Sequence, residues 1–106
     1  MELLPQVSFS IMIALSLRPR HGYEIIQQVE SDSMSKIHLG PGALYTTLKK
    51  LIESGLIEEI DLDQNGRRRY YQLTDKGWQR LNAEMDYYKN ISEISRVRLT
   101  QRWDRA

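Results

Sequence analysis

Apolar and polar residues follow one another along the 106-residue chain in a pattern that predicts two helices near its start. Over residues 6–17 the apolar side chains surround most of a helix, which is typical of an element at the centre of a core. The pair Arg18-Pro19 ends this helix, because the residue before a proline disfavours the helical backbone region. A second helix is predicted over residues 22–30, followed by a loop at residues 31–33.

The third predicted helix is amphipathic and spans residues 41–54. Pro41 suits its first turn and Gly55 suits its end, and residues 37–39 before it are predicted to form a very short strand. At about 100° per residue, its apolar side carries Leu44, Leu48, Leu51 and Ile52. Its opposite side carries Gly42, Thr46, Lys49 and Glu53, and its flanks carry Ala43, Tyr45 and Lys50. One side is therefore built for a core and the other for solvent or a partner.

Two extended segments follow the third helix, at residues 56–63 and 67–73. Asn65-Gly66 lies between them, and this dipeptide is the strongest short-range signal for a β-hairpin turn. The alternation of apolar and polar residues is imperfect in both segments. The pattern therefore predicts a hairpin without fixing its register.

A last helix begins after Thr74, which is a good N-cap candidate, and extends from residue 75 at least to residue 95. The order of elements predicts a mainly α fold with a small β-hairpin (α+β). We interpret residues 1–73 as a winged helix-turn-helix domain. Residues 74–106 are then a C-terminal dimerisation helix within the same compact unit.

Apolar residues recur at spacings of three and four along the last helix, at Trp78, Leu81, Met85, Tyr88, Ile91 and Ile94. Trp78 and Leu81 can either close the monomer core or join an interface. Too little chain follows to cover the later positions, and exposed apolar stripes of this size mark interfaces. A two-fold dimer lets one stripe serve both subunits. The predicted dimer interface comprises Met85, Tyr88, Ile91 and Ile94.

Composition narrows the classes of protein that remain. Hydrophobic residues make up 41% and charged residues 27%, which is ordinary for a globular domain. The absence of cysteine excludes disulfides, thiolate metal sites and cysteine nucleophiles, and it fits a reducing compartment. The longest apolar stretch, residues 7–17, is too short to span a bilayer and lacks the flanks of a signal peptide. We therefore expect a cytoplasmic protein without a membrane partner.

The net charge is only +1, from 15 basic and 14 acidic residues, which argues against a protein that coats nucleic acid by charge alone. The distribution of charge is more informative, because Lys49-Lys50 and Arg67-Arg68-Arg69 are basic clusters separated by acids. A nearly neutral protein can still present a basic surface.

The third helix has the features of a helix that reads DNA, because the major groove is about 12 Å wide and admits one α-helix. Gly42 and Ala43 would let the backbone approach DNA closely, and Thr46 could reach a base edge or a phosphate. Tyr45, Lys49 and Lys50 are candidate contacts to the DNA backbone. The alternative is an ordinary amphipathic surface helix.

The arginine run lies beside the predicted hairpin turn, where its members would alternate across a narrow ribbon. Arg67, Arg68 and Arg69 could there flank a minor groove or hold phosphates, since the planar guanidinium suits both. The alternative is pairing across the hairpin with the acids Glu58, Glu59 and Asp61. Both uses are compatible with the sequence.

Catalytic chemistry is not indicated. His21 and His38 are the only histidines, and their positions do not form a metal site. His21 lies at a helix start, which favours a capping or packing role. The sequence contains no recognisable nucleophile–base pair, carboxylate pair or glycine-rich phosphate loop. We predict no enzyme activity and no cofactor.

Several blocks of the sequence carry information when they are taken together. The blocks are His21-Gly22-Tyr23-Glu24-Ile25, Pro41-Gly42-Ala43-Leu44-Tyr45, Leu48 with Leu51, Gly55-Leu56-Ile57-Glu58, Gly66-Arg67-Arg68-Arg69-Tyr70-Tyr71, and Leu73-Thr74 with Gly77. They cover about Phe9 to Trp78, and together they resemble the PadR family of transcriptional regulators. The chain departs from the pattern at Ala43, where a threonine is common. It also stops soon after the first C-terminal helix, as in the short subgroup, so no dedicated effector domain is expected.

The resemblance implies a winged-helix homodimer that represses promoters and is often released by a small molecule. It implies that Tyr45, Thr46 and Lys49 face double-stranded DNA and that the wing arginines touch its backbone. For some short members it implies a planar aromatic effector in the dimer crevice, which makes Tyr88 a candidate effector contact. We therefore expect a sequence-specific repressor acting on a palindromic operator.

Two other functions remain open. A winged-helix protein–protein module would not bind DNA, although its wing and third helix should then be neutral or acidic. A ligand-sensing protein with vestigial DNA binding would draw on the aromatic residues Tyr87, Tyr88 and Trp103.

Overall fold

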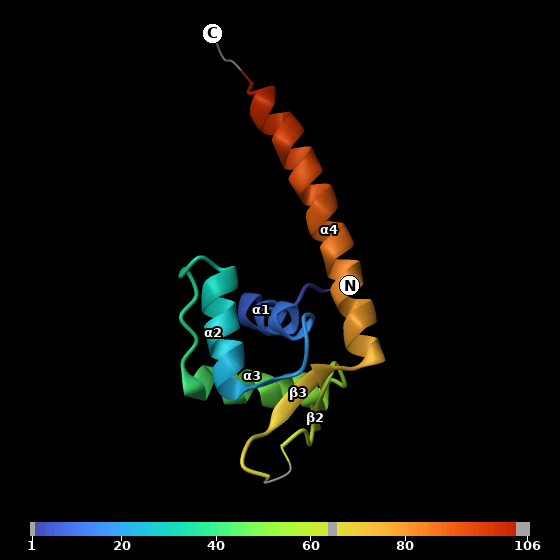
Figure 1. The fold of residues 1–106 in the computed structure, drawn as a ribbon. Coiled ribbons are helices and arrows are strands. Elements are labelled where there is room, and N and C mark those ends of the chain that lie inside the picture. Colours follow the sequence, from blue (N-terminus) through green and yellow to red (C-terminus); the bar gives the residue numbers. More distant parts are fainter. Residues whose placement is uncertain (1, 64–65, 104–106) are drawn as a thin grey trace.

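The structure, a computed structural model, describes residues 2–63 and 66–103 of the chain. The elements are α1 (Gln6–Leu15), β1 (Arg20–His21), α2 (Gly22–Asp32), α3 (Pro41–Glu53), β2 (Ile57–Ile60), β3 (Tyr70–Leu73) and α4 (Asp75–Thr100). Figure 1 shows a small body of three helices and a sheet, from which most of α4 projects as an arm. The predicted mainly helical winged-helix fold with a long last helix is confirmed.

Helix α1 lies at the centre of the body and contacts α2, α3, α4 and β3. Ile11, Met12 and Ala14 are completely buried, as the apolar sequence of this helix predicts. The helix ends at Leu15 and not at residue 17. The buried Arg20 side chain explains the early end, because its Nε donates to the carbonyl of Ala14 at 3.0 Å and satisfies one of the last free carbonyl groups.

Helix α2 begins with a capping box in which two residues satisfy each other's backbone donors. The amide of Glu24 donates to His21 Nδ1 at 3.4 Å, and the amide of His21 donates to Glu24 Oε1 at 3.3 Å. The predicted capping role of His21 is therefore confirmed. The loop predicted at residues 31–33 is wrong in part, because α2 continues to Asp32 and ends only where Met34 adopts a φ of 53°.

Helix α3 is amphipathic as predicted, with Leu44, Leu48 and Leu51 in the core. It ends in a Schellman motif: Leu56 donates its amide to the carbonyl of Leu51 at 3.0 Å, and Gly55 donates to Ile52 at 2.9 Å. Gly55 has a φ of +74°, a conformation that glycine adopts without steric cost. The end of α3 therefore lies where the glycine predicted it.

The sheet has three antiparallel strands in the order β1-β3-β2. The strand predicted at residues 37–39 is wrong: this segment pairs with no strand among the residues that the structure describes, although Leu39 is buried. The third strand is Arg20–His21 instead, because the connection between α1 and α2 passes along the free edge of β3. A two-residue strand has no pattern of its own in a sequence.

The two hairpin strands are shorter than predicted and cover residues 57–60 and 70–73. The arginines at 67–69 therefore belong to the connection between the strands, which we call the wing loop (residues 61–69). Gly66 has a φ of +63°, and its amide donates to the carbonyl of Asp63 at 2.9 Å. Asn65, the other residue of the predicted turn, lies outside the described residues.

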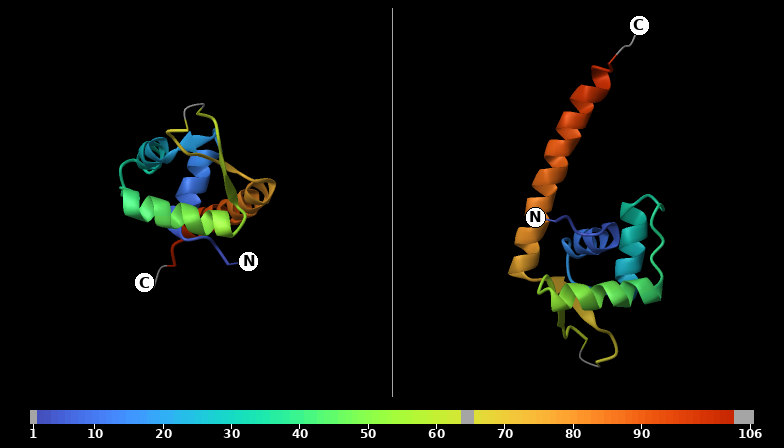
Figure 2. Two further views of the ribbon diagram at one scale, coloured as in Figure 1. Left: turned by 90° about the horizontal axis from the view of Figure 1, so that it is seen from below. Right: turned by 180° about the vertical axis from the view of Figure 1, so that it is seen from behind.

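Helix α4 begins as predicted, with the Thr74 hydroxyl accepting from the amide of Gly77 at 3.0 Å. A Cβ on Gly77 would lie 2.0 Å from the carbonyl oxygen of Leu56, so only glycine permits α4 to approach the end of α3 this closely. The helix reaches Thr100, and the right view of Figure 2 shows it extending well beyond the body of the molecule. No described helix has the length and apolar character needed to cross a membrane.

A buried carboxylate on α4 forms a hydrogen bond with the N-terminal segment. Glu84 is fully buried, and it accepts from the backbone amide of Leu4 at 3.0 Å and from Arg80 Nε at 2.6 Å. A buried charge needs such partners, since an unpaired one is strongly unfavourable. Beyond this point, from residue 85 to residue 103, every residue of α4 and its end is exposed.

Candidate nucleic-acid interface

The outward side of α3 carries no cover from the described parts of the chain. The six residues of α3 predicted to contact DNA, from its outward side and its flanks, are all exposed: Gly42, Ala43, Tyr45, Thr46, Lys49 and Lys50. Thr46 and Thr47 differ, because Thr47 Oγ1 donates to the carbonyl of Ala43 at 2.7 Å and so turns back onto its own helix. The exposed Thr46 side chain is therefore accessible to a molecule that approaches this side of α3.

The three arginines of the wing loop are also exposed. Arg69 Nε lies 3.6 Å from Glu59 Oε1, so the predicted pairing across the hairpin is present for this arginine. Glu58 does not take part, because its carboxylate accepts from Gln72 Nε2 at 2.7 Å. Among residues 2–63 and 66–103, Arg67 and Arg68 form no ion pair with an acid. Their charges therefore face solvent.

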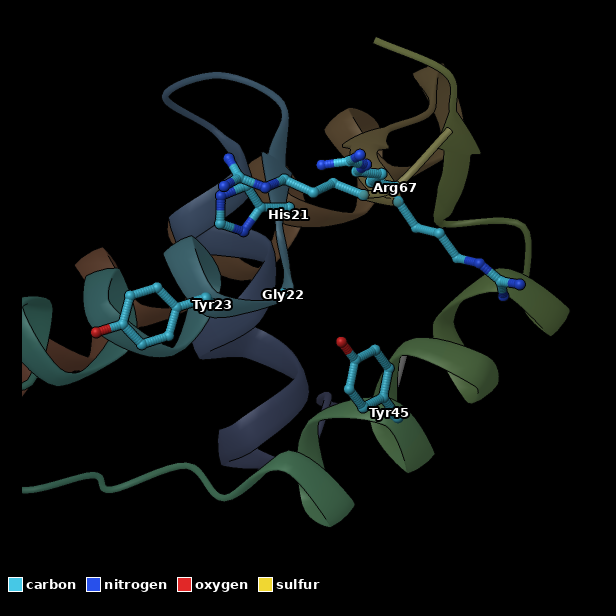
Figure 3. Close-up of a pocket in the computed structure, with 7 residues that line it drawn as sticks. His21, Gly22, Tyr23, Tyr45 and Arg67 are labelled. Carbon is cyan, nitrogen blue, oxygen red and sulfur yellow. The ribbon is translucent and has the colours of Figure 1, made fainter. Parts of the chain in front are cut away.

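A cleft of about 550 Å³ brings the wing loop and α3 together (Figure 3). It is lined by His21, Gly22, Tyr23, Tyr45, Arg67, Arg68 and Arg69. In Figure 3 the hydroxyl of Tyr45 points from α3 toward Gly22, while Arg67 lies on the opposite, wing side. The cleft therefore combines positive charge, hydroxyl groups and aromatic surface, which are the groups that hold a phosphodiester backbone.

Sequence reasoning missed three of these residues as site residues: His21, Gly22 and Tyr23. Gly22 packs against the end of the Tyr45 side chain, since a Cβ at Gly22 would be only 2.7 Å from the Tyr45 hydroxyl oxygen. No periodicity signals this approach, because residues 22 and 45 are on different helices. The one signal in the sequence is the block from His21 to Ile25, which carries part of the resemblance but assigns no role to its side chains.

The start of α2 makes an ion pair and a ring contact at the edge of the cleft. Arg18 Nη2 lies 2.6 Å from Glu24 Oε2, and the imidazole of His21 packs edge-on against the ring of Tyr70 with centroids 5.4 Å apart. The hydrogen bond from Arg18 is the main cause that lowers the pKa of Glu24 below its ordinary value. Glu24 is therefore kept as a carboxylate, the form that accepts from the capping amide.

Lys49 lines a second groove of about 370 Å³ between α3 and the sheet. Tyr45, Glu59, Arg69 and Tyr71 share its wall, so Tyr45 borders both hollows. Burial is the main cause that raises the pKa of Tyr71, and the charge of Glu59 raises it further. Gly42, Ala43 and Lys50 line neither hollow and lie along the exposed outer side of α3.

Comparison with known proteins identifies the family. Residues 11–83 match the transcriptional regulator PadR-like family, and this segment includes α2, α3, the sheet and the start of α4. The chain belongs to the PadR-like family. Its members are transcriptional regulators and not enzymes, and this chain is accordingly a transcriptional regulator.

Solved structures agree with this membership. A PadR family transcription regulator from Clostridium difficile R20291 superimposes with a TM-score of 0.74 at 26% identity, covering 90% of this chain and 99% of that chain. A transcriptional regulator from Clostridium thermocellum has the same fold, with a TM-score of 0.72 at 20% identity and coverage of 85% and 89%. The arm is thus part of the shared fold.

Among curated proteins, this PadR-like chain is 31% identical over 88 residues to the transcriptional regulator YqjI of Escherichia coli (strain K12). The match covers 83% of this chain but 42% of YqjI, so the chain spans less than half the length of that relative. The likeness therefore concerns 88 residues and leaves more than half of YqjI aside.

The interface residues predicted on the arm of this PadR-like regulator lie where a partner could reach them. Met85, Tyr88, Ile91 and Ile94 are 45%, 37%, 41% and 44% exposed. Leu81, one turn earlier, is buried, whereas Trp78 is exposed. The sequence left both open, and only Leu81 closes the monomer core. Pairing through the later positions stays a prediction.

Proposed function

We propose that this PadR-like regulator binds duplex DNA through α3 and the wing loop. The observation that carries the proposal is the exposed polar side of α3 beside a cleft lined by Arg67, Arg68 and Arg69. An α-helix fits the major groove, and arginines hold phosphates or enter a minor groove. Gly42 and Ala43 allow close approach, Thr46 contacts a base edge or a phosphate, and the DNA backbone is contacted by Tyr45, Lys49, Lys50 and the wing arginines.

The functional unit we propose is a homodimer, with residues 1–73 as the DNA-binding domain and residues 74–106 as the dimerisation helix. The exposed apolar row Met85, Tyr88, Ile91 and Ile94 supports this assignment, because water contacts it in the monomer. A two-fold dimer places two recognition helices on half-sites about one helical turn, roughly 34–36 Å, apart. The operator is accordingly a palindrome.

The regulatory outcome we propose is repression, because a dimer seated across a promoter excludes other proteins from it. A small aromatic effector would release the dimer by stacking at Tyr88. The ring of Tyr88 already lies among aromatics, with centroids 5.1 Å from Phe9 and 5.4 Å from Tyr87. This cluster joins α1 to the arm, so a ligand there can change the angle between the two DNA-binding domains.

Selection of bound duplexes from a random pool tests DNA binding, palindromy and half-site spacing together. The expected result is an enriched inverted repeat with centres about one helical turn apart. Enrichment of a single, asymmetric half-site would contradict the dimer. Retention of no duplex even in dilute buffer would contradict DNA binding and favour a winged-helix module that binds proteins.

Single substitutions then assign the contacts. Lys49→Ala and Arg68→Ala should each weaken binding and reduce the slope of log affinity against log salt by about 0.9 for each phosphate that the variant no longer neutralises. Lys89→Ala on the arm removes the same charge far from α3 and should leave the slope unchanged. Slopes equal to that of the unmodified protein in both α3 and wing variants would refute these assignments.

A further inference from the structure

The wing carries an acid on the side of the sheet that faces α3. Glu59 is the register partner of Tyr71, which is only 4% exposed, and side chains directly opposite each other in a sheet lie on the same side. Glu59 therefore lies on the side of the sheet that faces α3, although its side chain remains partly exposed to solvent. An acid is unexpected at this place, because the neighbouring surface is the one assigned to DNA phosphates.

The neighbour Glu58 provides an internal contrast. Successive residues of a strand point to opposite sides of the sheet, so Glu58 faces away from α3. Its carboxylate accepts from Gln72 Nε2 at 2.7 Å, and Gln72 is its register partner on that far side. The two glutamates have the same charge and adjacent positions, but they lie on opposite sides of the sheet.

Glu59 is engaged with one of the wing cations. Its Oε1 lies 3.6 Å from Arg69 Nε, with the side chains 44% and 75% exposed. Arg69 is thereby paired with an acid, whereas Arg67 and Arg68 form no ion pair within the described parts of the chain, although Arg68 lines a hollow with Glu59 and Asp61. Glu59, Arg69 and Lys49 all line the same groove of about 370 Å³, so the carboxylate shares this groove with cations from two different elements.

The surroundings of Tyr71 report the same arrangement of charge. After burial, the negative charge of Glu59 is the next cause that raises the pKa of this phenol, and the positive charge of Arg69 acts in the opposite direction. The charges of Glu59 and Arg69 therefore both act on the Tyr71 phenol, which lies on the α3 side of the sheet. A phosphate that approached Arg69 or Lys49 here would meet the field of Glu59 as well.

We propose that Glu59 restrains DNA binding by pairing with Arg69 in the free protein and by repelling the phosphate that Arg69 or Lys49 would hold. This inference rests on the proposed function. The restraint acts on backbone contacts, which supply most of the sequence-independent affinity. An acid at this position therefore makes binding depend more on the base contacts of α3.

The test compares two charge-neutralising variants, Glu59→Gln and Glu58→Gln, with the unmodified protein. The probe is a labelled random-sequence duplex of about 30 base pairs, long enough for two half-sites one turn apart. Affinity is measured by fluorescence anisotropy across a range of salt concentrations. Because the pair is exposed, Glu59→Gln should tighten binding about two- to fivefold, and Glu58→Gln should change it less.

The slope of log affinity against log salt is a second readout that a merely structural change would not move. Glu59→Gln frees Arg69 for a phosphate, so the slope should steepen by up to about 0.9. Arg69→Ala should cost less affinity in the unmodified protein than in the Glu59→Gln background, where no acid competes for the guanidinium. This double-mutant cycle measures the coupling of the two residues directly.

The results separate this inference from the proposed function. If the unmodified protein binds the duplex and Glu59→Gln gains nothing, or gains no more than Glu58→Gln, the inference is wrong and DNA binding stands. If no variant retains the duplex, both are wrong. Thermal unfolding checks that each variant is folded, and Glu59→Ser supplies a second neutral side chain should glutamine disturb the sheet.

Discussion

Helices α3 and α4 have the same kind of apolar repeat but meet different surroundings. In α3 the residues Leu44, Leu48 and Leu51 are buried by the rest of the body. In α4 the repeat is buried only at Leu81, and from residue 85 onward it is exposed. An apolar stripe therefore shows where a helix needs a partner, and it does not show whether its own chain supplies one.

The exposed sides of α3 and α4 have different proposed roles. On α3 the exposed polar side is the one proposed for DNA, and its apolar side packs in the core. On α4 the apolar side is the one proposed for a second subunit. Substitutions on matched sides of the two helices should consequently affect different measurements.

The largest effect is expected at Leu48 in the buried stripe of α3. Leu48→Ala removes buried methyl groups and leaves a cavity, which lowers the free energy of unfolding by about 2–5 kcal/mol. Urea denaturation followed by circular dichroism measures the loss. Thr46→Ala on the exposed side of the same helix is the control and should stay within about 0.5 kcal/mol. Equal losses in the two variants would break the distinction between the sides of α3.

The next effect concerns the exposed stripe of α4. Ile91→Glu introduces a charge twice into a two-fold interface and should raise the dimer dissociation constant at least about tenfold. Sedimentation equilibrium measures it. Lys89→Glu introduces the same side chain on the other side of the helix and should leave the dimer intact. A dimer of unchanged affinity in Ile91→Glu would show that a different surface pairs.

A smaller effect is expected where α2 supports the polar side of α3. In Gly22→Ala the new methyl group meets the Tyr45 hydroxyl at 2.7 Å, so the ring must move. The displaced Tyr45 hydroxyl then loses its hydrogen bond to a DNA phosphate, which should weaken DNA binding about two- to tenfold. Fluorescence anisotropy with the random-sequence duplex measures it. In a Tyr45→Phe background the same glycine substitution should cause no further loss, and an undiminished loss there would contradict this explanation.

The smallest effect is the contribution of Glu24 to stability at low pH. Its pKa is lowered in the folded protein, chiefly by the hydrogen bond from Arg18. The stabilisation is therefore present above the ordinary glutamate pKa of 4.5 and is lost as pH falls through the lower, folded value. The thermal unfolding temperature of the unmodified protein should fall slightly more over this range than that of Glu24→Gln. Parallel pH profiles would exclude this contribution.

Much of the body could be predicted because its signals are local. The end of α3 at Gly55, the cap at Thr74 and the exposure of Lys49 each depend on residues within a few positions of one another. The family resemblance agreed with these elements and with the matched segment, residues 11–83. The exposed wing arginines likewise followed from their place beside a hairpin turn.

The errors share a cause, which is contact between distant segments. Residues 37–39 have strand-like composition but reach no free edge, whereas Arg20–His21 has no strand signal and pairs with β3. Gly77 looks like a poor helix former, yet the backbone of Leu56 leaves no room for a Cβ there. In each case the deciding partner lies elsewhere in the chain.

By itself, the sequence determined the succession of the four helices and the hairpin, their polar and apolar sides, the end of α3 and the start of α4, because hydrogen bonding and side-chain spacing within an element act over a few residues. Only the tertiary structure decided that Gly22 and Tyr45 meet, that Glu59 faces α3 while Glu58 does not, and that the arm beyond Glu84 has no cover in the described chain. These are matters of relative placement, and they depend on how whole elements pack against one another.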